Sequence, residues 1–84
     1  MTDQPPLPPI QLVLERINPA VDMARFYVLA IEPPLFGDIA LRRDWGRIGC
    51  PGRTRRELFD NHTEATVALE TWLMRKLRRG YQAR

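Results

Sequence analysis

Prolines and glycines divide the first 60 residues of the chain into segments that are too short for most helices. The breaks fall at Asn18-Pro19, at residues 33–37 and at Pro51-Gly52. Between them, the segments are rich in β-branched and aromatic residues, which is typical of strands. We therefore expect about four antiparallel strands, over residues 10–17, 25–32, 39–48 and 54–60.

A single helix is expected after these strands. Asn61 and Glu64 have the spacing of a capping box, in which the first side chain accepts from early amides of the helix. Apolar residues then recur at helical spacing, and Gly80 stands where a left-handed cap would end a helix near Arg79. The sequence predicts an α+β fold: an antiparallel sheet with one C-terminal α-helix packed across one face.

The 84 residues are enough for one domain with one core. We place that domain at residues 10–84, after a flexible arm at residues 1–9 that contains four prolines. A chain of this size has little room for an enclosed catalytic cavity. It also lacks serine, and His62 is its only histidine. We therefore expect no catalytic residues, no metal site, no cofactor and no enzymatic activity.

Cys50 is the only cysteine, so no disulfide within the chain is possible. No stretch approaches the length that spans a membrane, and the N-terminus lacks a basic segment followed by an apolar one. We expect a cytoplasmic protein that is monomeric and does not contact membranes.

The cations of the chain are concentrated in its second half. Residues 1–41 carry two arginines against five acids, whereas residues 42–84 carry eleven basic residues against five acids. This asymmetry indicates a polyanion such as nucleic acid, with a solvated basic surface as the simpler alternative. The four cations at the helix end also have a structural explanation, because they meet the negative end of the helix dipole: Arg75, Lys76, Arg78 and Arg79.

The stretch "RRDWGRIGCPG" sets a tryptophan among these cations. Strand alternation places Arg43, Trp45 and Arg47 on one face, together with Ile39 and Leu41. Two interpretations of Trp45 remain open, a core residue or a surface residue. We favour exposure, because buried Arg43 and Arg47 without carboxylate partners would be unfavourable.

An exposed tryptophan beside arginine suits the end of a nucleic acid. The ring can stack on a base or lie against a sugar, and a guanidinium group can hold a phosphate. Neither contact reads sequence. On electrostatic grounds we add Arg43 and three arginines of the fourth strand to the candidate nucleic-acid-binding residues Trp45 and Arg47: Arg53, Arg55 and Arg56.

The chain resembles the WGR domain family, which is named for the triplet that here is Trp45-Gly46-Arg47. The resemblance rests on "RFYVLAI", "RRDWGRIGCPG", "LF", the helix and "KLRRGY" in that order, and extends from about Ile10 to Tyr81. Cys50 departs from the threonine or serine that is frequent in the family.

In eukaryotic poly(ADP-ribose) polymerases, the WGR domain lies beside a catalytic domain, binds a DNA break and relays its presence. The resemblance implies that Trp45 lies against the sugar of a DNA-end nucleotide and that Arg47 contacts the backbone. Because no polymerase domain follows, we do not expect the relay role here.

We therefore expect a small DNA-binding module that prefers ends, nicks or junctions and makes no sequence readout. The alternative is an adaptor that docks an acidic partner protein, such as a separately encoded DNA-processing protein.

Overall fold

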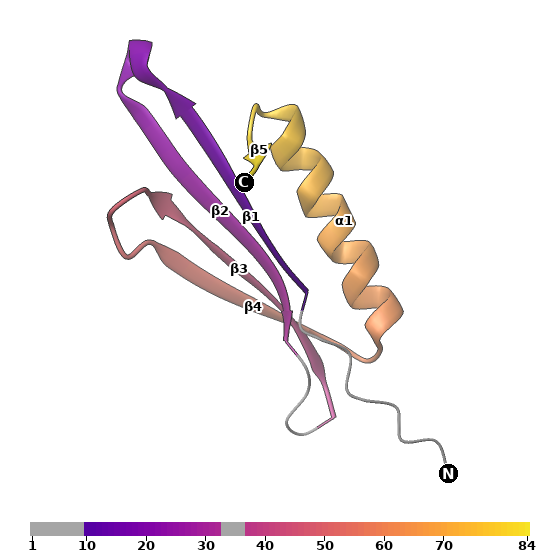
Figure 1. The fold of residues 1–84 in the computed structure, drawn as a ribbon. Helices are drawn as coiled ribbons and strands as arrows, with labels where there is room; N and C mark the ends of the chain where they lie inside the picture. Colours follow the sequence, from indigo (N-terminus) through magenta and orange to yellow (C-terminus); the bar gives the residue numbers. More distant parts are fainter. Residues whose placement is uncertain (1–9, 33–36) are drawn as a thin grey trace.

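The computed structural model describes residues 10–32 and 37–84 (Figure 1). The expected proline-rich arm at residues 1–9 and the prolines of the second break lie outside the described residues. The elements are β1 Ile10–Asn18, the 3-10 turn η1 Pro19–Val21, β2 Met23–Glu32, β3 Ile39–Arg47, β4 Arg53–Phe59, α1 His62–Arg78 and β5 Gln82–Ala83.

The strands form one antiparallel sheet in the order β4-β3-β2-β1-β5, and α1 packs on β2, β3 and β4. This confirms the predicted α+β architecture. The sheet has five strands rather than about four, because Gln82 and Ala83 pair with the outer edge of β1. A two-residue strand held by backbone pairing has no hydrophobic alternation from which it could be predicted.

The two ends of α1 are capped as the sequence predicts. The side chain of Asn61 accepts a hydrogen bond of 2.9 Å from the amide of Glu64. At the other end, Gly80 has a φ of 95°, and the amides of Gly80 and Tyr81 donate to the carbonyls of Leu77 and Lys76. These two bonds make a Schellman cap, and the Tyr81 side chain that follows is buried in the core.

Replacing Asn61 with alanine is expected to lower the free energy of unfolding by about 1 kcal/mol, because an early helix amide loses its acceptor. Chemical denaturation measures the change, and Asn61→Ser, which keeps an oxygen acceptor, serves as the control. A loss of equal size in the two variants would contradict a capping role.

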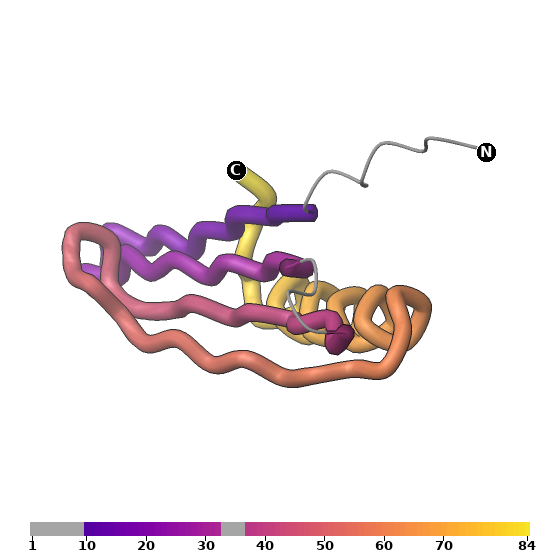
Figure 2. Tube along the Cα trace, turned by 90° about the horizontal axis from the view of Figure 1, so that it is seen from below, coloured from indigo at the N-terminus to yellow at the C-terminus, as the bar shows by residue number. Residues whose placement is uncertain are grey.

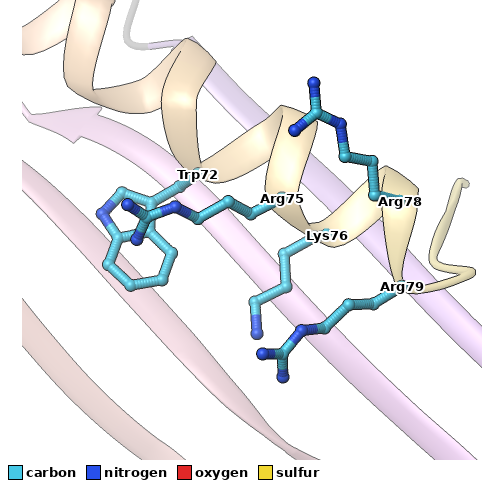
Figure 3. A pocket seen from close by; sticks show the side chains of 5 residues that line it. All are labelled: Trp72, Arg75, Lys76, Arg78 and Arg79. Carbon is cyan, nitrogen blue, oxygen red and sulfur yellow. The ribbon is translucent and has the colours of Figure 1, made fainter.

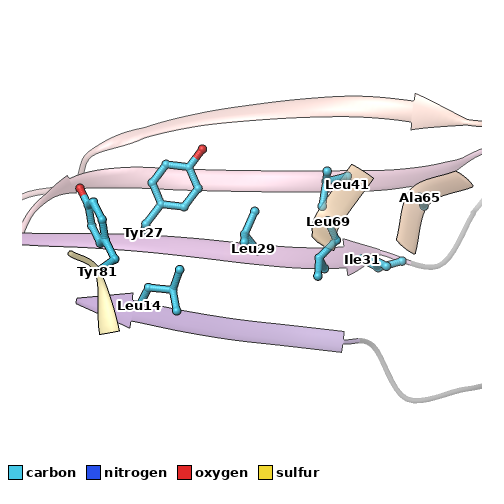
Figure 4. Packing of buried hydrophobic residues seen from close by; sticks show 8 residues of the cluster. All are labelled: Leu14, Tyr27, Leu29, Ile31, Leu41, Ala65, Leu69 and Tyr81. Atoms are coloured by element: carbon cyan, nitrogen blue, oxygen red, sulfur yellow. The ribbon is translucent and has the colours of Figure 1, made fainter. Parts of the chain in front are cut away.

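The core lies between α1 and one face of the sheet. Leu14, Leu29 and Leu41 come from three adjacent strands and are at most 1% exposed. Figure 4 shows them in the buried cluster with Leu69 of α1. We call this the helix-facing face of the sheet and the other the open face. In Figure 2, the β1–β2 and β3–β4 turns extend beyond the helix, so α1 covers only part of the helix-facing face.

Candidate nucleic-acid interface

The strand register settles which side chains share a face. In β3, Leu41, Arg43, Trp45 and Arg47 alternate onto the helix-facing face, as predicted. Trp45 lies between Tyr27 of β2 and Arg53 of β4. The alternation of side chains along β3 therefore places the WGR triplet at the rim of the core, since Leu41 is buried, Trp45 is half-buried and Arg47 is exposed.

Trp45 is neither fully exposed nor fully buried. Its ring is half-buried against the core and stacks on Tyr27, with ring centroids 6.0 Å apart and planes at 18°. The expectation of an exposed ring was thus only half right. The stacking partner holds one part of the indole in place and leaves another part accessible.

Arg43 contradicts the expectation of exposure, since only 7% of the residue is accessible. No carboxylate pairs with it. Instead its guanidinium carbon lies 3.8 Å from the centroid of the Trp72 ring and 5.6 Å from that of Trp45, and Nη1 donates to the Tyr27 hydroxyl at 3.1 Å. A guanidinium is weakly hydrated and stacks on aromatic faces, so it can be buried without an acid. Its Nε has no hydrogen-bond partner.

The other predicted arginines divide between the two faces. Arg47 is exposed, and Arg53 and Arg55 of β4 are exposed on the helix-facing face beside Trp45 and Arg43. Arg56 alternates onto the open face, where its Nε lies 2.8 Å from Oε1 of Glu32. The structure thus brings five of the six candidate residues together and separates Arg56 from them.

Acidic partners neutralise the open face. Glu32 holds both Arg42 and Arg56, and Asp44 holds Arg42 at 3.1 Å. The remaining ion pair of the described residues joins Arg84 to Glu15, whose strand position is also on the open face. Across residues 10–32 and 37–84, every ion pair therefore involves an open-face carboxylate, and the cations of the helix-facing face stay without one.

The C-terminal end of α1 adds further cations that the sequence explained only by the helix dipole. A depression of about 410 Å³ is lined by Trp72, Arg75, Lys76, Arg78 and Arg79. Figure 3 shows Lys76 and Arg79 on the same side of the helix as Trp72, whereas Arg78 points away. The guanidinium carbon of Arg75 lies 5.0 Å from the Trp72 ring centroid.

Lys76 is the only lysine of the chain, and its Nζ lies 4.4 Å from the centroid of the Tyr27 ring. Partial burial lowers the pKa of its ammonium group, and the charges of Arg79 and Arg43 lower it further. An anion bound beside this group would favour its charged form.

Gly46 and Gly52 allow the backbones of β3 and of the following turn to approach each other closely at the WGR triplet. A Cβ added to Gly46 would lie 2.7 Å from the Cα of Gly52, which comes from the far side of the turn. Gly52 has a φ of 77°, and a Cβ there would lie 2.5 Å from the carbonyl oxygen of Trp45. The hydrogen-bonded turn between these strands is closed by the Cys50 amide on the Arg47 carbonyl. The backbone thus packs too closely behind Trp45 for any side chain.

In the part of the chain that the structure describes, no group of three or more His, Cys, Asp or Glu side chains is placed to hold a metal ion. Cys50 is an exposed free thiol in the turn, and His62 is exposed at the helix start. None of the helices in the described residues combines the length and apolarity that crossing a membrane requires.

Fold and surface together define a small α+β module with a half-buried tryptophan and a cationic helix-facing face. The chain belongs to the WGR domain family, whose sequence profile matches residues 10–84. Membership in this family indicates a nucleic-acid-binding module.

One relative of this chain is the "Uncharacterized protein y4dW" of Sinorhizobium fredii (strain NBRC 101917 / NGR234). It is 43% identical over 76 residues, which cover 90% of this chain and 37% of the relative. The chain therefore spans little more than a third of the length of that protein. No solved structure matches the chain.

Proposed function

We propose that this chain is a non-enzymatic module that contacts DNA ends, nicks or junctions through sugar and phosphate. The separation of charge between the two faces of the sheet carries the proposal. Paired charges on the open face attract a polyanion weakly. On the helix-facing face, Glu57 is the carboxylate of β4, but among the described residues none of the arginines around Trp45 forms an ion pair. Such a surface favours phosphate and makes affinity depend on salt.

Within this surface, Trp45 and Arg47 have separate roles. The accessible part of the indole lies against a sugar or base, and the exposed guanidinium of Arg47 holds the neighbouring phosphate. Arg53 and Arg55 extend the positive field along β4. A ring that is already stacked on one side reaches a sugar or base most easily where the base stack is interrupted, which favours ends, nicks and junctions.

Sequence readout is not part of the proposal. Reading base edges in the major groove takes a helix or a two-stranded ribbon that can enter it. Ala65 and Leu69 of α1 are buried against the sheet, so this helix is committed to the core.

The proposal is tested by measuring binding to a blunt duplex, a nicked duplex and closed circular DNA at two salt concentrations. We expect tighter binding to the first two and weaker binding of all three at high salt. Equal affinity for all three would exclude the preference for ends and nicks. An absence of measurable binding would exclude the nucleic-acid function.

The same cationic face could dock an acidic protein, because tryptophan, tyrosine and arginine are frequent at the energetic centres of protein interfaces. This adaptor function is the second candidate. Affinity purification from nuclease-treated lysate distinguishes the two: one stoichiometric protein that persists after nuclease treatment favours the adaptor, and its loss favours nucleic acid.

Arg47→Gln and Arg56→Gln remove the same charge from opposite faces of the sheet. We expect Arg47→Gln to make the slope of log Kobs against log[salt] less steep by about 1, the value for one phosphate contact. Arg56→Gln should leave the slope nearly unchanged, because Arg56 is paired with Glu32 on the open face. Fluorescence anisotropy with an internally labelled nicked duplex measures both, and equal effects of the two variants would contradict a one-sided interface.

A further inference from the structure

Three arginines stand side by side in adjacent strands. Arg16 of β1 is directly opposite Arg25 of β2, and Arg25 is directly opposite Arg47 of β3. All three belong to the helix-facing face, two residues further along their strands than Leu14, Tyr27 and Trp45. Arg25 and Arg47 are exposed, and Arg16 is half-buried. We call these three residues the arginine row.

The arginine row disfavours the folded state. Like charges directly opposite each other in an antiparallel sheet repel and destabilise it. Among the described residues, no carboxylate lies within ion-pair distance of any of the three arginines. The carboxylates that do form ion pairs all belong to the open face of the sheet. Packing does not require arginine at Arg25 and Arg47, because their side chains lie at the exposed rim. A cluster that is unfavourable for folding and lies at the surface is typical of a binding site.

The arginine row lies between the WGR triplet on β3 and the C-terminal end of α1. At one end, Arg47 completes the triplet next to Trp45. At the other end, the Arg16 side chain reaches the helix terminus, since its Nε would be 3.4 Å from a Cβ placed on Gly80. Lys76 and Arg79 lie on the same side of α1 (Figure 3), and the ammonium group of Lys76 lies over the Tyr27 ring of β2. The row therefore extends from the WGR triplet to the residue that caps the C-terminal end of the helix.

The length of the row suits more than one phosphate. Directly opposed residues of an antiparallel pair are about 4.5–5.5 Å apart, so Arg16 and Arg47 are separated by about 10 Å. This distance exceeds the axial rise of about 3.4 Å per nucleotide, so the row is long enough to reach more than one phosphate of a strand.

We propose that the arginine row is a phosphodiester-binding track, which carries the strand from Trp45 across the sheet towards the C-terminal end of α1. The inference rests on the proposed nucleic-acid function and adds Arg16 and Arg25 to the interface. It also assigns the direction of the strand, perpendicular to β1, β2 and β3.

The test is Arg25→Glu, measured for thermal stability and for DNA binding in the whole chain. The new carboxylate would lie between two guanidinium groups, so the melting temperature should rise. Binding of a nicked duplex should weaken about tenfold at 150 mM salt, with a salt slope less steep by about 1. A residue with a merely structural role would not give higher stability together with weaker binding.

Arg56→Glu is the matched control, with the same change of charge on the open face. It breaks the pair with Glu32, so the melting temperature should fall while the salt slope stays nearly unchanged. The double variant Arg16→Gln/Arg25→Gln repeats the test without a new acid, and its slope should decrease by about 2.

The outcomes separate this inference from the proposed function. If the wild-type chain binds DNA and Arg47→Gln weakens binding, but Arg25→Glu and the double variant bind with the wild-type slope, the track is excluded and the function stands. If Arg25→Glu lowers the melting temperature, the row is not a site of repulsion and the inference fails. If the wild-type chain does not bind DNA, both fail.

Discussion

Replacing Gly52 with alanine is expected to lower the free energy of unfolding by about 2–5 kcal/mol, a large share of the stability of a domain of this size. Two costs combine. The backbone of Gly52 has a φ of 77°, which side chains disfavour, and a Cβ would approach the Trp45 carbonyl oxygen to 2.5 Å and Cζ of Phe26 to 2.8 Å. Because the Trp45 carbonyl oxygen is a backbone atom, the clash can be removed only if β3 and its turn move.

Gly49→Ala is the matched control for this prediction. Gly49 belongs to the same turn and has a φ of 92°, but nothing lies within 4 Å of an added Cβ. Its replacement should therefore cost only the conformational term, about 1–2 kcal/mol. Chemical denaturation of the two variants measures the difference. Equal losses would show that close backbone approach behind Trp45 does not constrain Gly52.

Replacing Trp45 with alanine is expected to weaken DNA binding by about 5- to 150-fold, which corresponds to about 1–3 kcal/mol of lost stacking. The half-buried ring also supports the core through Tyr27, so the free energy of unfolding should fall. We expect a loss of about 1–3 kcal/mol, less than the roughly 3–5 kcal/mol of a fully buried tryptophan. The variant should stay folded, so that both quantities can be measured.

Trp45→Phe separates the two roles of the ring. A phenyl ring retains an aromatic partner for Tyr27 but is smaller than indole on the accessible side, so stability should be kept better than affinity. Binding is measured by anisotropy and unfolding by denaturant on the same preparations. If Trp45→Ala loses stability while its DNA affinity stays at the wild-type value, Trp45 is a core residue only.

Local signals predicted the elements of this fold well. Asn61 and Gly80 were identified as helix caps because capping depends on residues next to each other in the chain. Proline and glycine breaks located the strands for the same reason. Alternation correctly placed Arg43, Trp45 and Arg47 on one face.

The burial of side chains at the rim of the core could not be predicted from such local signals. Arg43 was expected to be exposed because no carboxylate was available for it, whereas Trp72, 29 positions later in the chain, supplies the ring that covers it. Trp45 is half-buried because its ring packs on Tyr27 at the margin of the core cluster. Both outcomes depend on where the helix crosses the strands, which has no local signature.

By itself, the sequence determined the antiparallel strands, the capped helix, the positive second half and the membership of Trp45, Gly46 and Arg47 in the WGR pattern. Each depends on chain neighbours or on composition. Only the tertiary structure decided that Arg56 is neutralised on the open face and that Arg16, Arg25 and Arg47 stand in one row. The physical reason is the strand register: it alone places charges from neighbouring strands directly opposite one another, or turns them to opposite faces of the sheet.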